Sequence, residues 1–329
     1  MAGNTAVVDQ EQHSTDSRVA DYWDEHTDET FFGETYWLAN PAINRRYQRK
    51  AAGGRRYGSW VDFSVQHFLG SRSLLDRFLG RRKNSLPVDR VLSIGSGDGV
   101  LERHLASLNT AKQIDGIDLA PKRIEIAQRE ADEAGLTDTI RYSVCNVETT
   151  DFPGTDYDAI YFNSSLHHMS DLDGILSKCA AALKNNGYLF INEYIGPNRF
   201  ALSDKEKEVL EKTFFEIPAC YRHSHAEHDR GQIREHIYFP NPEEVERVDP
   251  SEAIHSAEIV AAVKQHFTIK EFNDCGGTLM QFLLHDIAGN FVERDPKSMQ
   301  ALQAIFDTED KLVATGELSP HFAMIVARP

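Results

Sequence analysis

VLSIGSGDG, residues 91–99, is the stretch of this chain that decides its fold. Its first four residues are an apolar run typical of a buried strand, and glycines follow at positions 95, 97 and 99. Glycine lets the backbone turn sharply, and it lets a ligand lie against the loop without meeting a Cβ atom. The stretch therefore predicts a strand, a ligand-binding loop and then a helix over 101–108.

Short apolar runs alternate with amphipathic segments through much of the chain. Helices are predicted from Pro121 and over 172–183, the second ending at Asn186 and Gly187. Strand and helix in alternation predict a parallel sheet with helices on both faces. The expected strands are 91–94, 114–118, 140–144, 157–162, 188–192, 268–272 and 322–327.

Asp118 is the expected acidic partner of the glycine loop. It ends a predicted strand, so its carboxylate should lie at the carboxyl edge of the sheet, where it can bind both ribose hydroxyls of an adenosine. The plainer alternative is a tight turn with a surface aspartate. A dinucleotide fingerprint would need glycine at position 100, which is Val100. An NAD-dependent oxidoreductase is therefore the less favoured enzyme class.

The GxGxG pattern resembles motif I of class I S-adenosylmethionine-dependent methyltransferases of the small-molecule type. Residues 157–169, YDAIYFNSSLHHM, resemble the family's fourth-strand motif, and 183–189, LKNNGYL, resemble the start of its fifth strand. The resemblance covers about 88–195 and resumes at the last strand. It implies an α/β, Rossmann-like, seven-stranded, mostly parallel sheet and S-adenosyl-L-methionine as cofactor. The expected cofactor-binding residues are Gly95, Ser96, Gly97, Gly99, Asp118, Leu119, Asn146, Val147 and Asn163.

Two positions depart from the family pattern, which has an acid at each. Ser93 stands two residues before the first glycine, and Asn146 stands where the adenine is bound. A hydroxyl can still orient the loop, but some attraction for the sulfonium end is lost. An asparagine oxygen can still accept from the adenine amino group. These departures keep open a cofactor-binding module that has the fold without the chemistry.

The chain divides into four predicted parts. Residues 1–85 form a helical amino-terminal lid, 86–196 the cofactor-binding core and 197–255 an inserted helical cap. Residues 256–329 return to the core and carry a helical insertion before the last strand. The lid is expected near the cofactor because a sulfonium attracts aromatic faces. Its aromatic residues are Tyr22, Trp23, Tyr36 and Trp37.

His167 and His168 are the candidate catalytic residues. They follow the fourth strand, at the edge toward which the methyl group should point. An unperturbed imidazole titrates near pH ~6.5 and can accept a proton from an acceptor hydroxyl or ammonium. His167 is the first choice, and simple packing of the loop is the alternative. No metal is expected, although the cap histidines His223, His225 and His228 could hold one or supply the base.

A basic stretch without acids runs from Arg45 to Arg56. It is either a solvated helix face or a surface that meets an anionic acceptor, because arginine binds phosphate and carboxylate bidentately. The net charge of −16 argues against a nucleic-acid partner, and no apolar run is long enough to span a membrane. The four cysteines form no CxxC pair and no secretory signal is visible, which favours a cytoplasmic location.

These features together predict a methyltransferase that acts on a small or medium-sized acceptor. O-methylation of a sugar or natural-product scaffold is the first choice, by analogy with the family. N- and C-methylation stay open, and the sequence leaves the oligomeric state undetermined.

Overall fold

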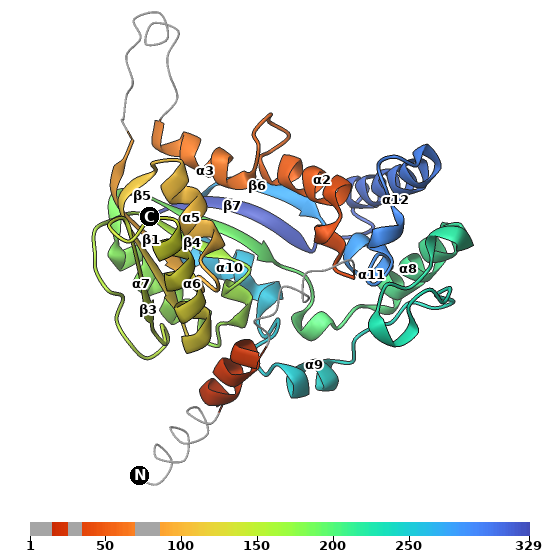
Figure 1. Cartoon of the computed structure of the whole chain (residues 1–329), viewed down its shortest axis with the longest axis horizontal. Helices are drawn as coiled ribbons and strands as arrows, with labels where there is room; N and C mark the ends of the chain where they lie inside the picture. Colours follow the sequence, from red (N-terminus) through yellow and green to blue (C-terminus); the bar gives the residue numbers. More distant parts are fainter. Residues whose placement is uncertain (1–14, 26–34, 70–85) are drawn as a thin grey trace, which may run out of the picture.

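A computed structural model of the chain describes residues 15–25, 35–69 and 86–329. Seven strands form one sheet in the order β3-β2-β1-β4-β5-β7-β6 (Figure 1). Strands β1 to β5 run parallel, and β7 lies antiparallel between β5 and β6. The predicted seven-stranded, mostly parallel α/β sheet is confirmed. The strands are β1 (Val88–Ile94), β2 (Ala111–Asp118), β3 (Ile140–Val144), β4 (Tyr157–Asn163), β5 (Leu183–Tyr194), β6 (Thr268–Gly276) and β7 (Phe322–Arg328).

The helices begin where the sequence supplies capping groups. Asn40 accepts from the backbone N–H groups of Ala42 and Ile43 at the start of α2, and Pro121 is the first residue of α6. Residues 15–25 are also helical. The other helices are α2 (Pro41–Ala51), α3 (Trp60–Leu69), α5 (Val100–Ser107), α6 (Pro121–Glu133), α7 (Leu172–Ala182), α8 (Asp204–Glu216), α9 (Pro242–Val248), α10 (Ile259–His266), α11 (Met280–Leu283) and α12 (Pro296–Ala314).

One helix boundary differs from the prediction. Helix α7 ends at Ala182 and β5 starts at once at Leu183, so Asn186 and Gly187 lie inside the strand instead of ending the helix. The pairing of β4 with β5 shifts register between Tyr157 and Ala159. This irregularity accommodates the extra strand residues, which a turn signal alone does not reveal.

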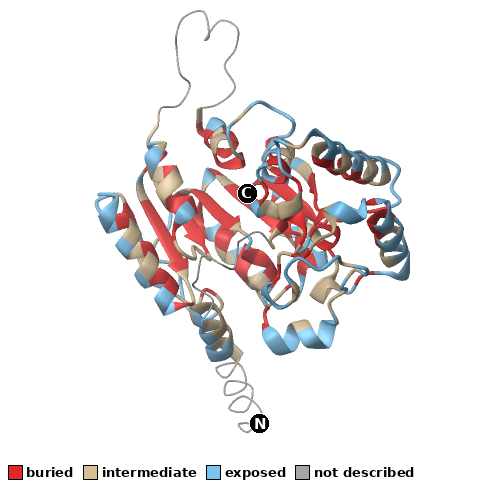
Figure 2. Cartoon of the chain, turned by 45° about the vertical axis from the view of Figure 1, so that its right-hand side comes forward, coloured by how far each residue is buried: buried red, intermediate tan, exposed pale blue. Residues whose placement is uncertain are grey.

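The sheet buries both of its faces. Neighbouring strand residues point to opposite sides, so Val91 belongs to one hydrophobic cluster and Leu92 to the other. The first cluster includes apolar residues of α2, α3, α5, α8 and α12, and the second those of α7 and α10. Figure 2 shows the buried strands between helices with exposed outer faces. This two-faced burial explains the near-continuous apolar runs of the strands.

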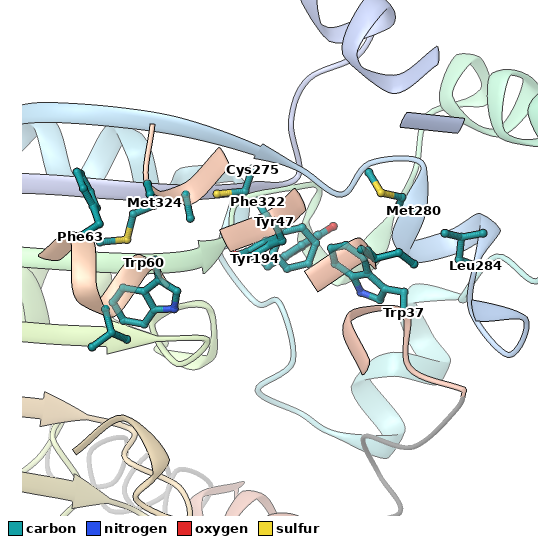
Figure 3. Packing of buried hydrophobic residues seen from close by; sticks show 14 of the residues in the cluster. Trp37, Tyr47, Trp60, Phe63, Tyr194, Cys275, Met280, Leu284, Phe322 and Met324 are labelled. Atoms are coloured by element: carbon teal, nitrogen blue, oxygen red, sulfur yellow. The ribbon is translucent and has the colours of Figure 1, made fainter. Parts of the chain in front are cut away.

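The predicted amino-terminal lid does not form one unit in the structure. Trp37, Tyr47, Trp60 and Phe63 are buried in the same cluster as sheet residues (Figure 3). The Trp37 ring lies 5.3 Å from that of Phe322 on β7. Helices α2 and α3 are therefore part of the core, because large aromatic side chains gain most by burial against the sheet. The lid residues 1–14, 26–34 and 70–85 lie outside the described part.

The basic stretch pairs with acids from the carboxyl-terminal half of the chain. Arg46 lies 3.0 Å from Glu309 and 2.7 Å from Asp310, and Lys50 lies 2.8 Å from Asp310. Arg45 pairs with Glu293 and Arg55 with Glu271. None of these basic residues lines the large cavity described below. These ion pairs favour the interpretation of the stretch as part of the packed structure, although Arg45, Arg46, Arg49 and Lys50 line a separate pocket of about 700 Å³. The interpretation of the stretch as a binding surface for an anionic acceptor stays a prediction.

The two insertions lie beyond the sheet, at the end where α8, α9 and α12 are seen (Figure 1). The first, predicted over 197–255, contains α8, α9 and several short 3-10 turns, and the second contains α11 and α12. Within the described ranges, no helix is both long and apolar enough to cross a bilayer.

The buried pair of Arg46 and Glu309 makes a testable contribution to stability. Glu309 is fully buried and also accepts from the backbone N–H of Leu279. Arg46→Ala would leave this carboxylate without its cation, so we expect a loss of about 3–5 kcal/mol in the free energy of unfolding. Chemical denaturation measures it. Arg49→Ala, an exposed change in the same helix, should cost less than about 0.5 kcal/mol. An equal decrease in unfolding free energy for Arg46→Ala and Arg49→Ala would show that the Arg46–Glu309 pair does not stabilise the fold.

Candidate active site

A cavity of about 1090 Å³ opens at the carboxyl ends of β1, β2 and β4. This volume lies slightly above the range of about 300–1,000 Å³ for small-molecule sites, so the cavity can hold more than one small ligand. Gly99 is absent from the lining. The sequence-derived site residues that do line it are Gly95, Ser96, Gly97, Asp118, Leu119, Asn146, Val147, Asn163, His167 and His168.

Two glycines of the loop serve different purposes. Gly97 has a φ of +52°, and a Cβ atom there would meet nothing within 4 Å, so its open side faces the cavity. Gly99 has a φ of +77°, and a Cβ atom there would lie 2.2 Å from the hydroxyl oxygen of Tyr142. Gly97 therefore leaves room for a ligand, whereas Gly99 starts α5 and permits close packing of β3.

Asp118 holds the glycine loop in place. One carboxylate oxygen accepts from the backbone N–H of Gly97 at 2.8 Å, and the other accepts from that of Ala120 at 2.9 Å. Burial raises the pKa of this carboxyl, while these hydrogen bonds oppose the rise. Each oxygen keeps a further lone pair, so the side chain can also accept from hydroxyl groups in the cavity.

Glu102, in the first turn of α5, is a site residue that the sequence did not reveal. It is fully buried beside Ser93, it lines the cavity, and neither carboxyl oxygen has a hydrogen-bond partner among the described residues. Burial raises the pKa of Glu102 from 4.5 to about 7. A buried carboxyl without a partner is costly, and a cationic group of a ligand would relieve that cost. The sequence alone does not distinguish Glu102 from a solvent-exposed glutamate on a helix.

Asp16 reaches the position expected for adenine binding. The Asn146 side chain donates to a carboxylate oxygen of Asp16 at 2.8 Å, and its own oxygen accepts from the backbone N–H of Glu148 at 2.9 Å. The Asn146 side-chain oxygen, which was expected to accept from adenine, thus accepts from the backbone of the loop after β3. A carboxylate from the helix over 15–25 lines the cavity beside it. No local pattern could have indicated this pairing, because the partners lie far apart in the chain.

His167 is tightly held by Glu193 at the opposite wall. Its Nδ1 lies 2.5 Å from a carboxylate oxygen of Glu193, which is fully buried. The second oxygen of Glu193 accepts from the backbone N–H groups of Ser165 and Leu166 at 2.5 and 2.6 Å. Glu193 therefore fixes both the loop after β4 and the orientation of the His167 ring.

His168 lies beside His167 in a second hydrogen-bonded arrangement. The two ring centroids are 4.1 Å apart, and Nδ1 of His168 lies 2.9 Å from the hydroxyl oxygen of Ser251. Glu252 lies 3.6 Å from Nε2 of His167 and 3.9 Å from Nε2 of His168. The inserted segment thus supplies the acidic side of this wall.

The two histidines have different electrostatic surroundings. Burial lowers the pKa of His167, but Glu193, Glu252 and Asp249 outweigh it and raise the pKa to about 9. Burial and the charge of His167 lower the pKa of His168. A protonated imidazole has no free lone pair on its ring nitrogens, so His167 in the ligand-free protein is not suited to accept a proton from an acceptor.

The helix over 15–25 covers this end of the cavity. The Trp23 ring meets that of His168 edge-on at 5.3 Å, and the Arg123 guanidinium lies 5.5 Å from the Trp23 ring. Asp24 accepts from the backbone N–H of Lys122 at the start of α6. Tyr22 and Trp23 line the cavity with Tyr36 and Trp37. This helix therefore bridges the cofactor side and the histidine side of the site.

The cap histidines do not converge on the cavity. Nδ1 of His223 lies 3.0 Å from the Gly231 carbonyl oxygen, and the backbone N–H of His225 donates to Asp286. Neither they nor His228 lines the cavity, and they form no metal-binding group among the described residues. Among the described residues, the positions of the cap histidines therefore give no support to a cap metal site or a cap base.

Comparison with known proteins identifies the central segment. Residues 92–191 match the family model described as a methyltransferase domain. The ubiquinone biosynthesis O-methyltransferase of Methylocella silvestris is 28% identical over 158 residues, 48% of this chain and 58% of that protein. The 27-O-demethylrifamycin SV methyltransferase of Amycolatopsis mediterranei is 28% identical over 142 residues, 42% of this chain and 50% of that protein. The chain thus spans little more than half the length of these curated relatives.

A solved structure shares the whole fold. Geranyl diphosphate methyltransferase in complex with GPP and sinefungin superposes with a TM-score of 0.54. The superposition covers 95% of this chain and 98% of that chain at 14% sequence identity. This similarity extends over the insertions as well as the sheet, and it concerns architecture alone.

The raised pKa of Glu102 predicts a pH-dependent loss of stability. The unfolded carboxyl ionises near pH 4.5 and the folded one near 7, so folding is progressively disfavoured as the pH rises through that window. Asp118 on β2 adds to the rise and Arg103 on α5 opposes it. Glu102→Gln should therefore raise Tm relative to wild type more at pH 8 than at pH 5.

Thermal denaturation of the ligand-free protein at both pH values measures this difference. Glu125→Gln, an exposed change on α6, is the matched control and should leave the pH dependence of Tm unaltered. A Tm difference between wild type and Glu102→Gln that is the same at both pH values would show that Glu102 does not ionise in this window.

Proposed function

We propose that this chain, whose residues 92–191 form a class I methyltransferase domain, transfers the methyl group of S-adenosyl-L-methionine to a small or medium-sized acceptor. The observation that carries the proposal is the cavity wall formed by the glycine loop, Asp118 and the unpartnered carboxyl of Glu102. The family expected from the sequence motifs is confirmed by the domain match.

The polar groups of this wall suit each part of the cofactor. Asp118 would accept from the ribose hydroxyls, and Asp16 would accept from the adenine amino group that Asn146 was expected to bind. Glu102 would meet the ammonium of the methionine part, the attraction that Ser93 does not supply. Ser96 Oγ and Asp98 Oδ1 are also buried without partners among the described residues, so they have capacity for further ligand hydrogen bonds.

The chain's own contribution to the reaction is alignment and exclusion of water. The bound cofactor supplies an electrophilic methyl group on a sulfonium, and the acceptor must attack it in line. The helix over 15–25 covers the cavity, and Glu193 fixes His167 at the wall where an acceptor would lie. We assign His167 and His168 to the side that orients the acceptor, and His168, whose pKa is lowered, to the removal of its proton.

The acceptor we favour is a hydroxyl of a sugar or natural-product scaffold. The names of the two curated relatives support O-methylation. N-methylation is the second candidate, because Glu193, Asp249 and Glu252 make the histidine wall acidic and suit an amine. The same carboxylates disfavour an anionic acceptor. Free Cys145, Cys179, Cys220 and Cys275 are compatible with the cytoplasmic location we propose.

Product analysis with a deuterated-methyl cofactor tests this function. Hydroxylated quinol, sugar and polyketide-like acceptors, each with an amine analogue, would be incubated with the protein and analysed by mass spectrometry. We expect the labelled methyl group on one acceptor class. Binding of S-adenosylhomocysteine without transfer would instead support a non-catalytic module, and binding of NAD alone would overturn the assignment.

Asp118→Ala should weaken cofactor binding. The change leaves ribose hydroxyls without a partner and releases the Gly97 loop, so we expect a loss of about 1–3 kcal/mol in binding free energy. Titration calorimetry with S-adenosylhomocysteine measures it. Asp138→Ala, an exposed change between α6 and β3, is the control and should leave affinity as it is. Wild-type affinity in Asp118→Ala would reject the ribose assignment.

The helix over 15–25 should contribute to cofactor affinity through Asp16. Asp16→Ala removes the carboxylate next to Asn146, and a chain that begins at residue 26 removes the whole helix but keeps the buried Trp37 and Asn40. Both should bind S-adenosylhomocysteine several-fold more weakly while circular dichroism and Tm report a folded sheet. Unchanged affinity in both proteins would exclude the helix from the cofactor site.

A further inference from the structure

We infer that His167, His168 and Glu252 form a binding site for a divalent transition-metal ion at the acceptor end of the cavity. Each residue offers one ligand atom, and these atoms all lie within 4.8 Å of one another. The histidines follow β4 in the 3-10 turn Leu166–His168, and Glu252 comes from the inserted segment after α9. The proposed site thus joins the sheet edge to the insertion.

The spacing of the three side chains fits an ion between them. The Glu252 carboxylate lies 3.6 Å from Nε2 of His167 and 3.9 Å from Nε2 of His168, which is too long for hydrogen bonds. Nitrogen and oxygen ligands at about 2.0–2.2 Å from an ion lie about 3–3.5 Å apart in common geometries. The two Glu252–histidine distances would have to shorten by a few tenths of an ångström. Since the ligand atoms of the group all lie within 4.8 Å of one another, the largest approach needed is about 1.3 Å.

The other nitrogen of each ring is already engaged. Glu193 can only accept, so Nδ1 of His167 carries the hydrogen. The Ser251 hydroxyl donates to Asp249 at 2.7 Å and so accepts from Nδ1 of His168. Both Nε2 atoms are thereby left to face Glu252. Histidines that bind metals nearly always have Nδ1 or Nε2 anchored in this way, because the anchor fixes the ring and its tautomer.

The charge of the surroundings favours a cation. Glu193 and Asp249 are buried, and Glu252 is about three quarters buried, with 24% of its side chain exposed. One oxygen of Asp249 has no hydrogen-bond partner among the described residues and lies 3.8 Å from His168. Three carboxylates in a low-dielectric wall need compensation. A bound divalent ion supplies it, and protonation of His167 is the competing explanation.

The donor set indicates which ions would bind. Two imidazoles and one carboxylate suit zinc, iron(II), cobalt(II) or nickel(II), whereas magnesium and calcium prefer oxygen ligands only. Three protein ligands leave coordination positions open toward the cavity. If the proposed methyl transfer is correct, an acceptor hydroxyl that meets the ion there would lose its proton more readily. The binding of the ion itself does not depend on that function.

Metal titration of chelator-treated full-length protein tests the inference. Calorimetry with zinc and absorption spectroscopy with cobalt should show one ion per chain, with cobalt bands typical of nitrogen and oxygen ligands. Glu252→Gln and His168→Ala should each lose at least tenfold in affinity, and Glu193→Gln should lose about 10–100-fold because it frees the His167 ring. His228→Ala, an exposed cap change, should bind as wild type does.

Circular dichroism and Tm of each variant confirm that a lost site is not lost folding. Wild type that binds zinc and cobalt no more tightly than a folded Glu252→Gln protein would overturn the proposal and leave a protonated histidine–carboxylate network. Calorimetry with S-adenosylhomocysteine on the metal-free protein keeps the two proposals apart. Metal binding without cofactor binding would refute only the methyltransferase function.

Discussion

Carboxylates at the carboxyl edge of the sheet hold the loops that form the walls of the cavity. Asp118 ends β2 and accepts from Gly97 in the loop that follows β1. Glu193, near the end of β5, accepts from Ser165 and Leu166 in the loop that follows β4. In both cases an acid on one strand fixes the loop of its neighbour, since backbone N–H groups at this edge have no strand to pair with. Asp118 also lines the cavity, where its remaining lone pairs favour ligands with hydroxyl or cationic groups.

A chain of polar contacts connects the amino-terminal core to this edge. The Tyr47 hydroxyl on α2 donates to the Asn192 side-chain oxygen at 2.7 Å, and Asn192 donates to Asn163 at 2.8 Å. Asn163 ends β4 and lines the cavity. Tyr47 also packs against Phe322 on the antiparallel strand β7. The packing of α2 on the sheet therefore helps to position Asn163 in the cavity wall. Helix α2 is thus part of the hydrophobic core and does not act as a lid over the cavity.

Local patterns in the sequence were sufficient for the sheet and for the glycine loop. The strands, Gly97 and Asp118 could be predicted from the sequence because each depends on residues close to it in the chain. The sequence could not predict contacts between residues that lie far apart in the chain. The basic stretch faces Glu309 and Asp310, and an aromatic helix such as α3 has the same spacing whether it packs as core or as lid. Asp16 was missed for the same reason, since only the fold brings it to Asn146. Glu102 lies in the same strand–loop–helix unit as Ser93, but the sequence does not distinguish it from an exposed helix glutamate.

In the fold, a carboxyl group from another element lies beside each of the two positions that depart from the family pattern. Position 93 lacks its acid, and Glu102 supplies a buried carboxyl beside it from α5. Position 146 lacks its acid, and Asp16 supplies a carboxylate from the helix over 15–25. The same helix also places Trp23 against His168 at the other end of the cavity. The helix over 15–25, eleven residues long, therefore connects the two ends of the cavity.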